Sequence, residues 1–362
     1  MKQLCIILIS ICFFACSSKK NNGVETVLVL GGKADNTSLI EFEDLFEPVG
    51  VQPLETDREC LVTNVSKVDV FEGDYYILDR YQQNTILVFN SLGHFVRRIG
   101  VLGKGHGEYP GISDFAIDRI RRQVVVLSAP SKVYIYDMNG TFVKAKDISK
   151  SLLWNIISCE DGFICSSNHR TYTEGEDACL FYRFDEEFVM QDKWGEVLPQ
   201  QLHVAGQTSS ILQEDNGSLF YIDNYMNDIY SLNRKQVQYH VELPKPMPLK
   251  YLVSTDDFME NQYKYDYIID ALLYEDRHLF TYIHAGKYYM AYVKDGKIEK
   301  DGLFHGILPN LYKGGDGDIL GVVSAESYLQ NWKKHFKFSQ DDSIKAGDNY
   351  VILRYRIRHL GE

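Results

Sequence analysis

The feature that most constrains the fold of this chain is a repeat of about 47 residues. The segment ILVFNSLGHFVRRIG, which begins at Ile86, aligns with VYIYDMNGTFVKAKD, which begins at Val133, so that Gly93 matches Gly140. Each copy contains an apolar strand, a turn with glycine and a second strand that opens with Phe-Val. The same unit recurs at residues 181–191 and 229–238, and a looser copy lies at residues 289–300. A further strand is expected before each copy, at residues 75–79, 123–128, 163–167, 218–223 and 279–284.

Four short strands in each repeat of this length are typical of a β-propeller blade. A β-sandwich would explain the short strands but not their period. Five copies can be read directly, and residues 318–324 together with 349–360 suggest a sixth. The sequence therefore predicts an all-β chain with six four-stranded blades, in which residues 36–362 form a single domain.

The two ends of such a ring have to pair, because an open ring would expose a sheet edge. We expect residues 49–54 or their neighbours to complete the blade that the C-terminal residues build. The blade spacing stretches in two places, where we expect short helical insertions. One follows Ser254, which can cap a helix, and the other lies in residues 324–342.

The N-terminus has the layout of a signal peptide. Leu4 to Ala15 is an apolar run that would rise about 18 Å as a helix, less than the roughly 30 Å needed to cross a bilayer. Phe-Phe-Ala-Cys, ending at Cys16, resembles a bacterial lipoprotein cleavage box. We therefore expect residues 1–15 to be a signal peptide, Cys16 to be lipidated and residues 16–35 to form a polar tether. Ser17 after the cysteine favours the outer membrane, on either its periplasmic or its surface side.

Charge and cysteine content restrict the partners and the redox chemistry. The net charge of −12 disfavours nucleic acid as a partner and leaves the N-terminal lipid as the expected contact with the membrane. Four cysteines remain outside the signal peptide and the lipidation site. Cys159 and Cys165 flank a tight hairpin turn, but we expect thiols there and no disulfide.

One segment resembles a known propeller family. VFNSLGHFVRRIGVLGKGHGEYPGISDFAID, residues 88–118, is similar to an NHL-type repeat, in which a Gly-rich link leads into the next blade. QPLET at residues 52–56 and GDNYVILRYRIRH at residues 347–359 resemble the two ends of the six-bladed β-propeller lipoproteins of gut-type Gram-negative bacteria. That family has no established general activity, so the resemblance implies a fold and a compartment but no reaction.

Two short motifs suggest ligands that the sequence does not support. Residues 103–109, GKGHGEY, lack the Gly-Lys-Ser/Thr ending of a phosphate loop, so we interpret them as a link between blades in which Glu108 accepts hydrogen bonds from backbone amides. Asp316-Gly317-Asp318 lacks the glutamate of a calcium loop and is expected to form a hairpin turn. No common catalytic motif is present, so we expect no cofactor and favour a role without catalysis.

Propeller topology suggests where a ligand would bind. The turn between the second and third strands of a blade opens on the same face as the link to the next blade. Aromatic and polar side chains on that face, with Trp154 among the stacking candidates, would bind a glycan or a peptide. An alternative is a metal-assisted lyase or hydrolase that uses three histidines of this set, at positions 106, 169 and 284, and another is a scaffold for an envelope protein. The expected ligand-binding residues are Arg80, Tyr81, His106, His169, Arg170, Asp223, Tyr225 and His284.

Overall fold

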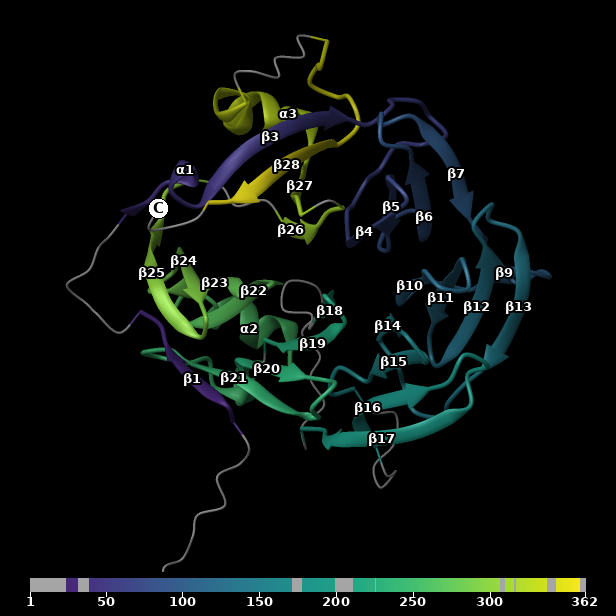
Figure 1. Ribbon diagram of the computed structural model, residues 1–362, viewed down its shortest axis with the longest axis horizontal. Helices are drawn as coiled ribbons and strands as arrows, with labels where there is room; N and C mark the ends of the chain where they lie inside the picture. The colour runs from purple at the N-terminus through teal and green to yellow at the C-terminus, as the bar shows by residue number, and fades with distance from the viewer. Residues whose placement is uncertain are drawn as a thin grey trace, which may run out of the picture.

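The computed structural model shows six β-sheets arranged around a central axis (Figure 1). It describes residues 24–31, 39–170, 178–198, 211–224, 226–306, 310–315, 317–336 and 343–358. Each sheet contributes a four-stranded blade, so the predicted all-β, six-bladed propeller is confirmed. Within the described residues, no helix is both long and apolar enough to cross a membrane.

The first three blades follow the predicted repeat. Each is an antiparallel meander whose strands run in chain order from the axis outward. Their strands are β4 (Lys67–Phe71), β5 (Asp74–Asp79), β6 (Thr85–Phe89) and β7 (Phe95–Ile99); β10 (Asp114–Asp118), β11 (Gln123–Ser128), β12 (Lys132–Asp137) and β13 (Phe142–Asp147); and β14 (Asn155–Cys159), β15 (Gly162–Ser166), β16 (Cys179–Phe184) and β17 (Met190–Glu196).

Blades 4 to 6 keep this order, and N-terminal strands are added to each of them. Their own strands are β18 (Ile211–Asp215), β19 (Ser218–Asp223), β20 (Asp228–Ser231) and β21 (Gln236–Glu242); β22 (Tyr267–Tyr274), β23 (Arg277–His284), β24 (Lys287–Lys294) and β25 (Lys297–Phe304); and β26 (Asn310–Lys313), β27 (Ile319–Val323) and β28 (Val351–Ile357). The N-terminal strands are β1 (Thr26–Val29), β2 (Leu39–Ile40) and β3 (Phe46–Pro53).

The core lies between the blades, which explains why the central strands are apolar on both sides. In β11, Val124 and Val126 pack toward blade 1, whereas Val125 and Leu127 pack toward blade 3. Side chains alternate across a strand, so a sheet packed on both faces needs an apolar residue at every position. Val124 to Leu127, the four middle residues of QVVVLS, meet that need, and all four are buried.

The ring closes where the sequence predicts it. β3 pairs antiparallel with β28, from Phe46 opposite Ile357 to Pro53 opposite Val351, and so becomes the outer strand of blade 6. The predicted residues 49–54 therefore complete the C-terminal blade. Helix α1 (Phe42–Leu45) packs beside this pair, and the Phe42 ring contacts Trp332 and Tyr355.

Both predicted insertions contain helix. Helix α2 (Thr255–Asn261) follows a 3₁₀ turn, η1 (Leu249–Tyr251), and the Ser254 side chain caps it by accepting a hydrogen bond from the Asp257 amide. The insertion in blade 6 contains α3 (Ala325–Ser327), a π-helical turn, η2 (Tyr328–Trp332), and a 3₁₀ turn, η3 (Lys333–His335).

The N-terminal strands β1 and β2 lie on the outside of the ring (Figure 1). β1 pairs parallel with β21 as a fifth strand of blade 4, and β2 pairs parallel with β25 as a fifth strand of blade 5. Leu28 and Leu30 are buried there. Residues 26–29, which the sequence analysis placed in the tether, therefore belong to the folded body, because their alternate apolar side chains find a sheet edge to cover.

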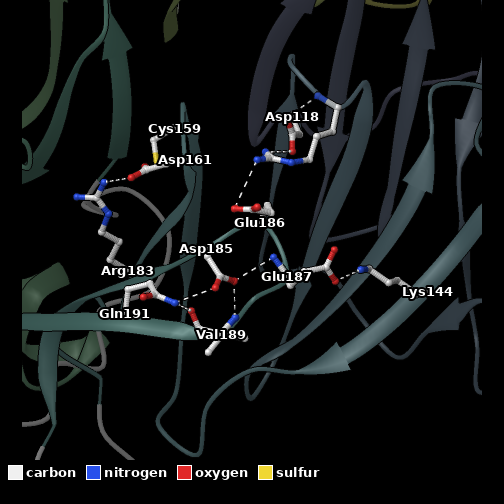
Figure 2. A network of polar contacts seen from close by, with 11 residues as sticks. Asp118, Lys144, Cys159, Asp161, Arg183, Asp185, Glu186, Glu187, Val189 and Gln191 are labelled. Carbon is white, nitrogen blue, oxygen red and sulfur yellow. Dashed lines mark hydrogen bonds and ion pairs between the residues drawn. The ribbon is translucent and has the colours of Figure 1, made fainter.

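One face of the ring has only short turns, and ion pairs connect its neighbouring blades. Figure 2 shows this face at blades 2 and 3, where Lys144 lies 2.5 Å from Glu187. Arg121 of blade 2 also lies 3.7 Å from Glu186 of blade 3. Arg122 of blade 2 pairs in the same way with Glu72 of blade 1. We call this the short-turn face. Among the described residues, the long links, including residues 54–66, 100–113 and 243–266, lie on the other side, which we call the loop face.

Candidate functional site

Three segments of the loop face meet at the indole of Trp154. Arg80 comes from the turn after β5 in blade 1, Trp154 from the link into blade 3, and Arg170 from the segment after β15. The Arg170 guanidinium carbon lies 3.9 Å from the centre of the Trp154 ring, and that of Arg80 lies 5.6 Å from it. All three side chains are half-buried. The structure thus brings together two of the predicted ligand-binding residues around the tryptophan.

Tyr81 extends this cluster toward solvent. The Arg80 guanidinium carbon lies 5.8 Å from the Tyr81 ring centre, and Tyr81 is 54% exposed. We call Arg80, Tyr81, Trp154 and Arg170 the arginine–tryptophan cluster. It combines a positive charge with an open aromatic face, as in sites that bind polar ligands with a planar or ring-shaped part.

A buried carboxylate holds the turn that carries Arg80. Asp79 is fully buried, and its two oxygens accept hydrogen bonds from the amides of Thr63 and Asn64, from the Thr63 hydroxyl and from the amides of Gln82 and Gln83. Both Asp79 oxygens are therefore occupied by these hydrogen bonds, and Asp79 forms no ion pair with Arg80, although the two residues are adjacent in the chain.

The predicted residues His169 and Asp223 hold the turn that carries Arg170. His169 Nε2 lies 2.7 Å from Asp223 Oδ2, and both side chains are buried. His169 Nδ1 accepts a hydrogen bond from the Leu198 amide, so Nε2 carries the proton that is donated to Asp223. This burial separates the polar atoms of both residues from a ligand at the surface, so we assign them the role of positioning blade 3 against blade 4.

The remaining predicted residues do not join the cluster. His284 Nδ1 lies 3.0 Å from Asp266 Oδ2, and the buried Asp266 also accepts hydrogen bonds from the amides of Lys245 and Ala285. Tyr225 lies outside the described residues, as does the lipidation site Cys16. The predicted residues that the structure brings together are therefore Arg80, Tyr81 and Arg170.

His106 lies near the outer rim of blade 2. Its ring packs edge-on against Phe142 of β13, at 5.0 Å between ring centres. A cavity of about 350 Å³ opens there, lined by residues 103–108 and by Pro110, Lys132, Tyr134, Phe142 and Ala145.

Glu108 explains the glycines of this link, as the sequence analysis expected. Its Oε2 accepts a hydrogen bond from the Gly105 amide at 2.7 Å. A Cβ atom at position 103 would lie 1.9 Å from the same oxygen. A carboxylate of the chain itself therefore occupies the position that a phosphate would take, and the phosphate-loop interpretation is excluded at this amide.

The histidines of the metal-assisted alternative are engaged separately. His169 contacts Asp223, His284 contacts Asp266 and His106 contacts Phe142. Across the part of the chain that the structure describes, no group of three or more His, Cys, Asp or Glu side chains could hold a metal ion. In the other suspected metal loop, Asp318 is buried and accepts a hydrogen bond from Arg354 Nε at 2.9 Å, while Asp316 lies outside the described residues.

Two charged features near the axis were not found from the sequence. Lys67 of β4 donates to Asp114 Oδ1 at 2.9 Å and to the Phe115 carbonyl at 2.7 Å, which joins the innermost strands of blades 1 and 2. On β22, burial raises the pKa of Asp270 to about 7. Neither residue stands in a motif, and only the packing of the innermost strands reveals them. The role of Trp154 could have been inferred more firmly, since it directly precedes the innermost strand of blade 3.

A solved structure has a fold similar to this architecture. A crystal structure of a putative exported protein from Bacteroides fragilis NCTC 9343 is similar over 93% of this chain and 100% of its own, with a TM-score of 0.71 and 18% sequence identity. The WD40 repeats of RRP9 match 86% of this chain and 100% of their own, with a TM-score of 0.47 and 9% identity.

The sequence comparisons give a family but no activity. No curated protein matches the chain. A family model described as a domain of unknown function, DUF4934, matches residues 25–356, which covers all six blades. The chain therefore belongs to the DUF4934 family and is a six-bladed β-propeller.

Proposed function

We propose that this protein is a ligand-binding module of the bacterial envelope that captures a glycan or a peptide on its loop face. The observation that carries the proposal is the meeting of Arg80, Trp154 and Arg170 from three separate segments. A stable core requires no pair of arginines around one half-buried indole, whereas such groups are common where polar ligands bind. No reaction is proposed.

The supports of the cluster favour binding with little rearrangement. Asp79 fixes the turn before Arg80, and the pair of His169 and Asp223 fixes the turn before Arg170. A site whose backbone is already held in place loses less conformational entropy when a ligand binds.

The test is a fluorescence titration of the full chain with panels of oligosaccharides and peptides. Of the three tryptophans, Trp154 alone belongs to the cluster, so a ligand bound there should change its emission. We expect a saturable change that Trp154→Phe removes and that Trp194→Phe, a change at β17 of blade 3, leaves in place. A response lost in Trp194→Phe but kept in Trp154→Phe would place the ligand elsewhere and refute the proposal.

We also propose that lipid on Cys16 anchors the protein to the outer membrane. Support comes from the cleavage box at Cys16, from the resemblance of residues 52–56 and 347–359 to the ends of β-propeller lipoproteins and from the similarity to a protein described as exported. The position of the first described residues adds a geometric argument. β1 pairs Thr26 with Tyr239 and Val29 with Glu242, so the chain enters blade 4 at the short-turn face, where Glu25 pairs with Arg234.

An anchor that enters at the short-turn face would leave the loop face pointing away from the membrane. Only seven residues separate Cys16 from Val24, and the eight peptide links between them span at most about 28 Å. Labelling with radioactive palmitate should mark the wild-type chain but not Cys16→Ser. A label that persists in Cys16→Ser would contradict the anchor.

A further inference from the structure

The charges around Arg80 indicate the chemical class of the ligand. The chain has a net charge of −12, and most arginines of its short-turn face pair with a carboxylate of a neighbouring strand or blade. Arg80 differs from them. Among the described residues, no carboxylate lies within 4.0 Å of its guanidinium, and its buried Nε has no hydrogen-bond partner.

The carboxylates around the cluster are occupied. Asp79 accepts hydrogen bonds from four amides and one hydroxyl, and Asp223 accepts from His169 and from the Met226 amide. Both are fully buried. They therefore cannot swing out to neutralise Arg80 without leaving several backbone donors unsatisfied, which costs about 1–3 kcal/mol for each buried group.

A half-buried guanidinium with an unused donor favours an anion that can reach it, because its charge-assisted hydrogen bonds are stronger than neutral ones. The Trp154 ring covers one side of Arg80, and the Tyr81 ring extends from the same turn into solvent. An exposed aromatic ring beside the cation provides a flat apolar surface for the C–H face of a sugar ring. Carboxylate and pyranose ring occur together in a uronic acid.

From this arrangement we infer that the arginine–tryptophan cluster binds an acidic glycan, with a uronate carboxylate on Arg80 and the sugar ring on Tyr81. The inference rests on the proposed function and names its ligand class. It needs no metal and no covalent step.

The test compares two probes that differ in charge and keep the same linkage and length, an oligogalacturonate and its methyl ester. Their dissociation constants are measured by calorimetry with the full chain in a non-ionic detergent. We expect the acidic probe to bind at least tenfold more tightly than the ester, and its affinity to fall as salt is added.

The variant Arg80→Gln should weaken binding of the acidic probe by about tenfold to a hundredfold and leave binding of the ester unchanged, since one charge-assisted contact is lost. Arg80→Lys should recover part of this loss. The matched control is Arg122→Gln, which makes the same change of charge at an exposed ion pair on the short-turn face and should bind both probes like the wild type. Thermal melts of each variant show whether the fold is intact.

Each of the other outcomes would refute a specific part of the inference. Equal affinity for acid and ester, or an equal loss of both in Arg80→Gln, would refute the acidic ligand but leave a binding module. An oligoglutamate peptide that binds more tightly than oligogalacturonate and shows the same dependence on Arg80 would replace the glycan by an acidic peptide. If no oligosaccharide or peptide in either titration binds, both the inference and the proposed function fail.

Discussion

At the scale of single residues, the polar groups of the loop face divide into those that hold turns and those that remain available. Asp79, Asp223 and Asp266 are buried and accept backbone hydrogen bonds. Arg80 and Tyr81 stand on a turn held in this way, and they reach solvent. Propeller loops thus place exposed side chains on a rigid support, and the residue types alone do not show which side chains hold a turn and which reach solvent.

Gly93 lies where blade 1 contacts the closing strand β3, and this contact leaves no room for a side chain. It has φ +76, and a Cβ atom there would lie 2.1 Å from the Pro53 carbonyl oxygen of β3. Gly217 has φ +77 with nothing within 4 Å, so it is the matched control. In both alanine variants, the left-handed backbone conformation should lower the free energy of unfolding by about 1 kcal/mol. Gly93→Ala should lower it by at least about 2 kcal/mol more. Urea unfolding measures both, and equal losses would show that blades 1 and 6 are not pressed together at this point.

Asp270 should make stability depend on pH. Burial raises the pKa of Asp270 from 3.8 to about 7. Between these two pH values, the folded protein keeps a proton on Asp270 that the unfolded chain releases. The stability it contributes is complete below about pH 4 and is lost as pH rises through 7. Asp270→Asn should therefore be more stable than the wild type at pH 8 by about 1–2 kcal/mol, and the advantage should vanish near pH 4.

Urea unfolding at pH 4, 6 and 8 tests this prediction. Asp276→Asn, in the exposed turn after β22, controls for the loss of one negative charge. A constant difference between Asp270→Asn and the wild type across this range would mean that Asp270 is not shielded from water.

At the scale of elements, the N-terminal strands have two different roles. β1 and β2 cover the outer edges of blades 4 and 5, which are already four-stranded, whereas β3 is the outer strand of blade 6 itself. Covering an edge removes a template for pairing with other chains, and completing a blade holds the ring together.

Two truncations separate these roles. A chain that starts at residue 39 loses the buried Leu28 and Leu30 and should be destabilised by about 3–5 kcal/mol, but it should still unfold in one transition. A chain that starts at residue 54 also loses β3 and should show no cooperative melt. Differential scanning calorimetry distinguishes the two, and similar melting temperatures would show that β3 is dispensable for closure.

At the scale of the whole molecule, the sequence predicts the number and order of the blades well, because each blade is specified by residues that are close together in the chain. The 47-residue offset between Gly93 and Gly140 corresponds to the same turn in blades 1 and 2, with φ +76 and +84. Closure could also be predicted, since a ring leaves few partners for its last strand. The place of residues 26–29 could not, because an outer fifth strand is set by an available sheet edge that is more than 200 residues away.

The site was predicted only in part, for a related physical reason. Topology correctly identifies which loops share a face, and it brings Arg80 and Arg170 to one indole. Topology does not predict how deeply a side chain is buried. His169 and Asp223 have the chemistry of ligand contacts, but their neighbours enclose them, and that enclosure depends on loops from two blades.

The pairing of β3 with β28 also sets the order in which the molecule can be made. A chain that is synthesised with its N-terminus first produces β3 about 300 residues before its pairing partner, β28. Until Val351–Ile357 arrives, the growing chain holds at most five blades and two unmatched edges. The ring can therefore close only after nearly the whole chain has been synthesised, and until then the sheet edges that β3 and β28 cover in each other remain open to pairing with other chains.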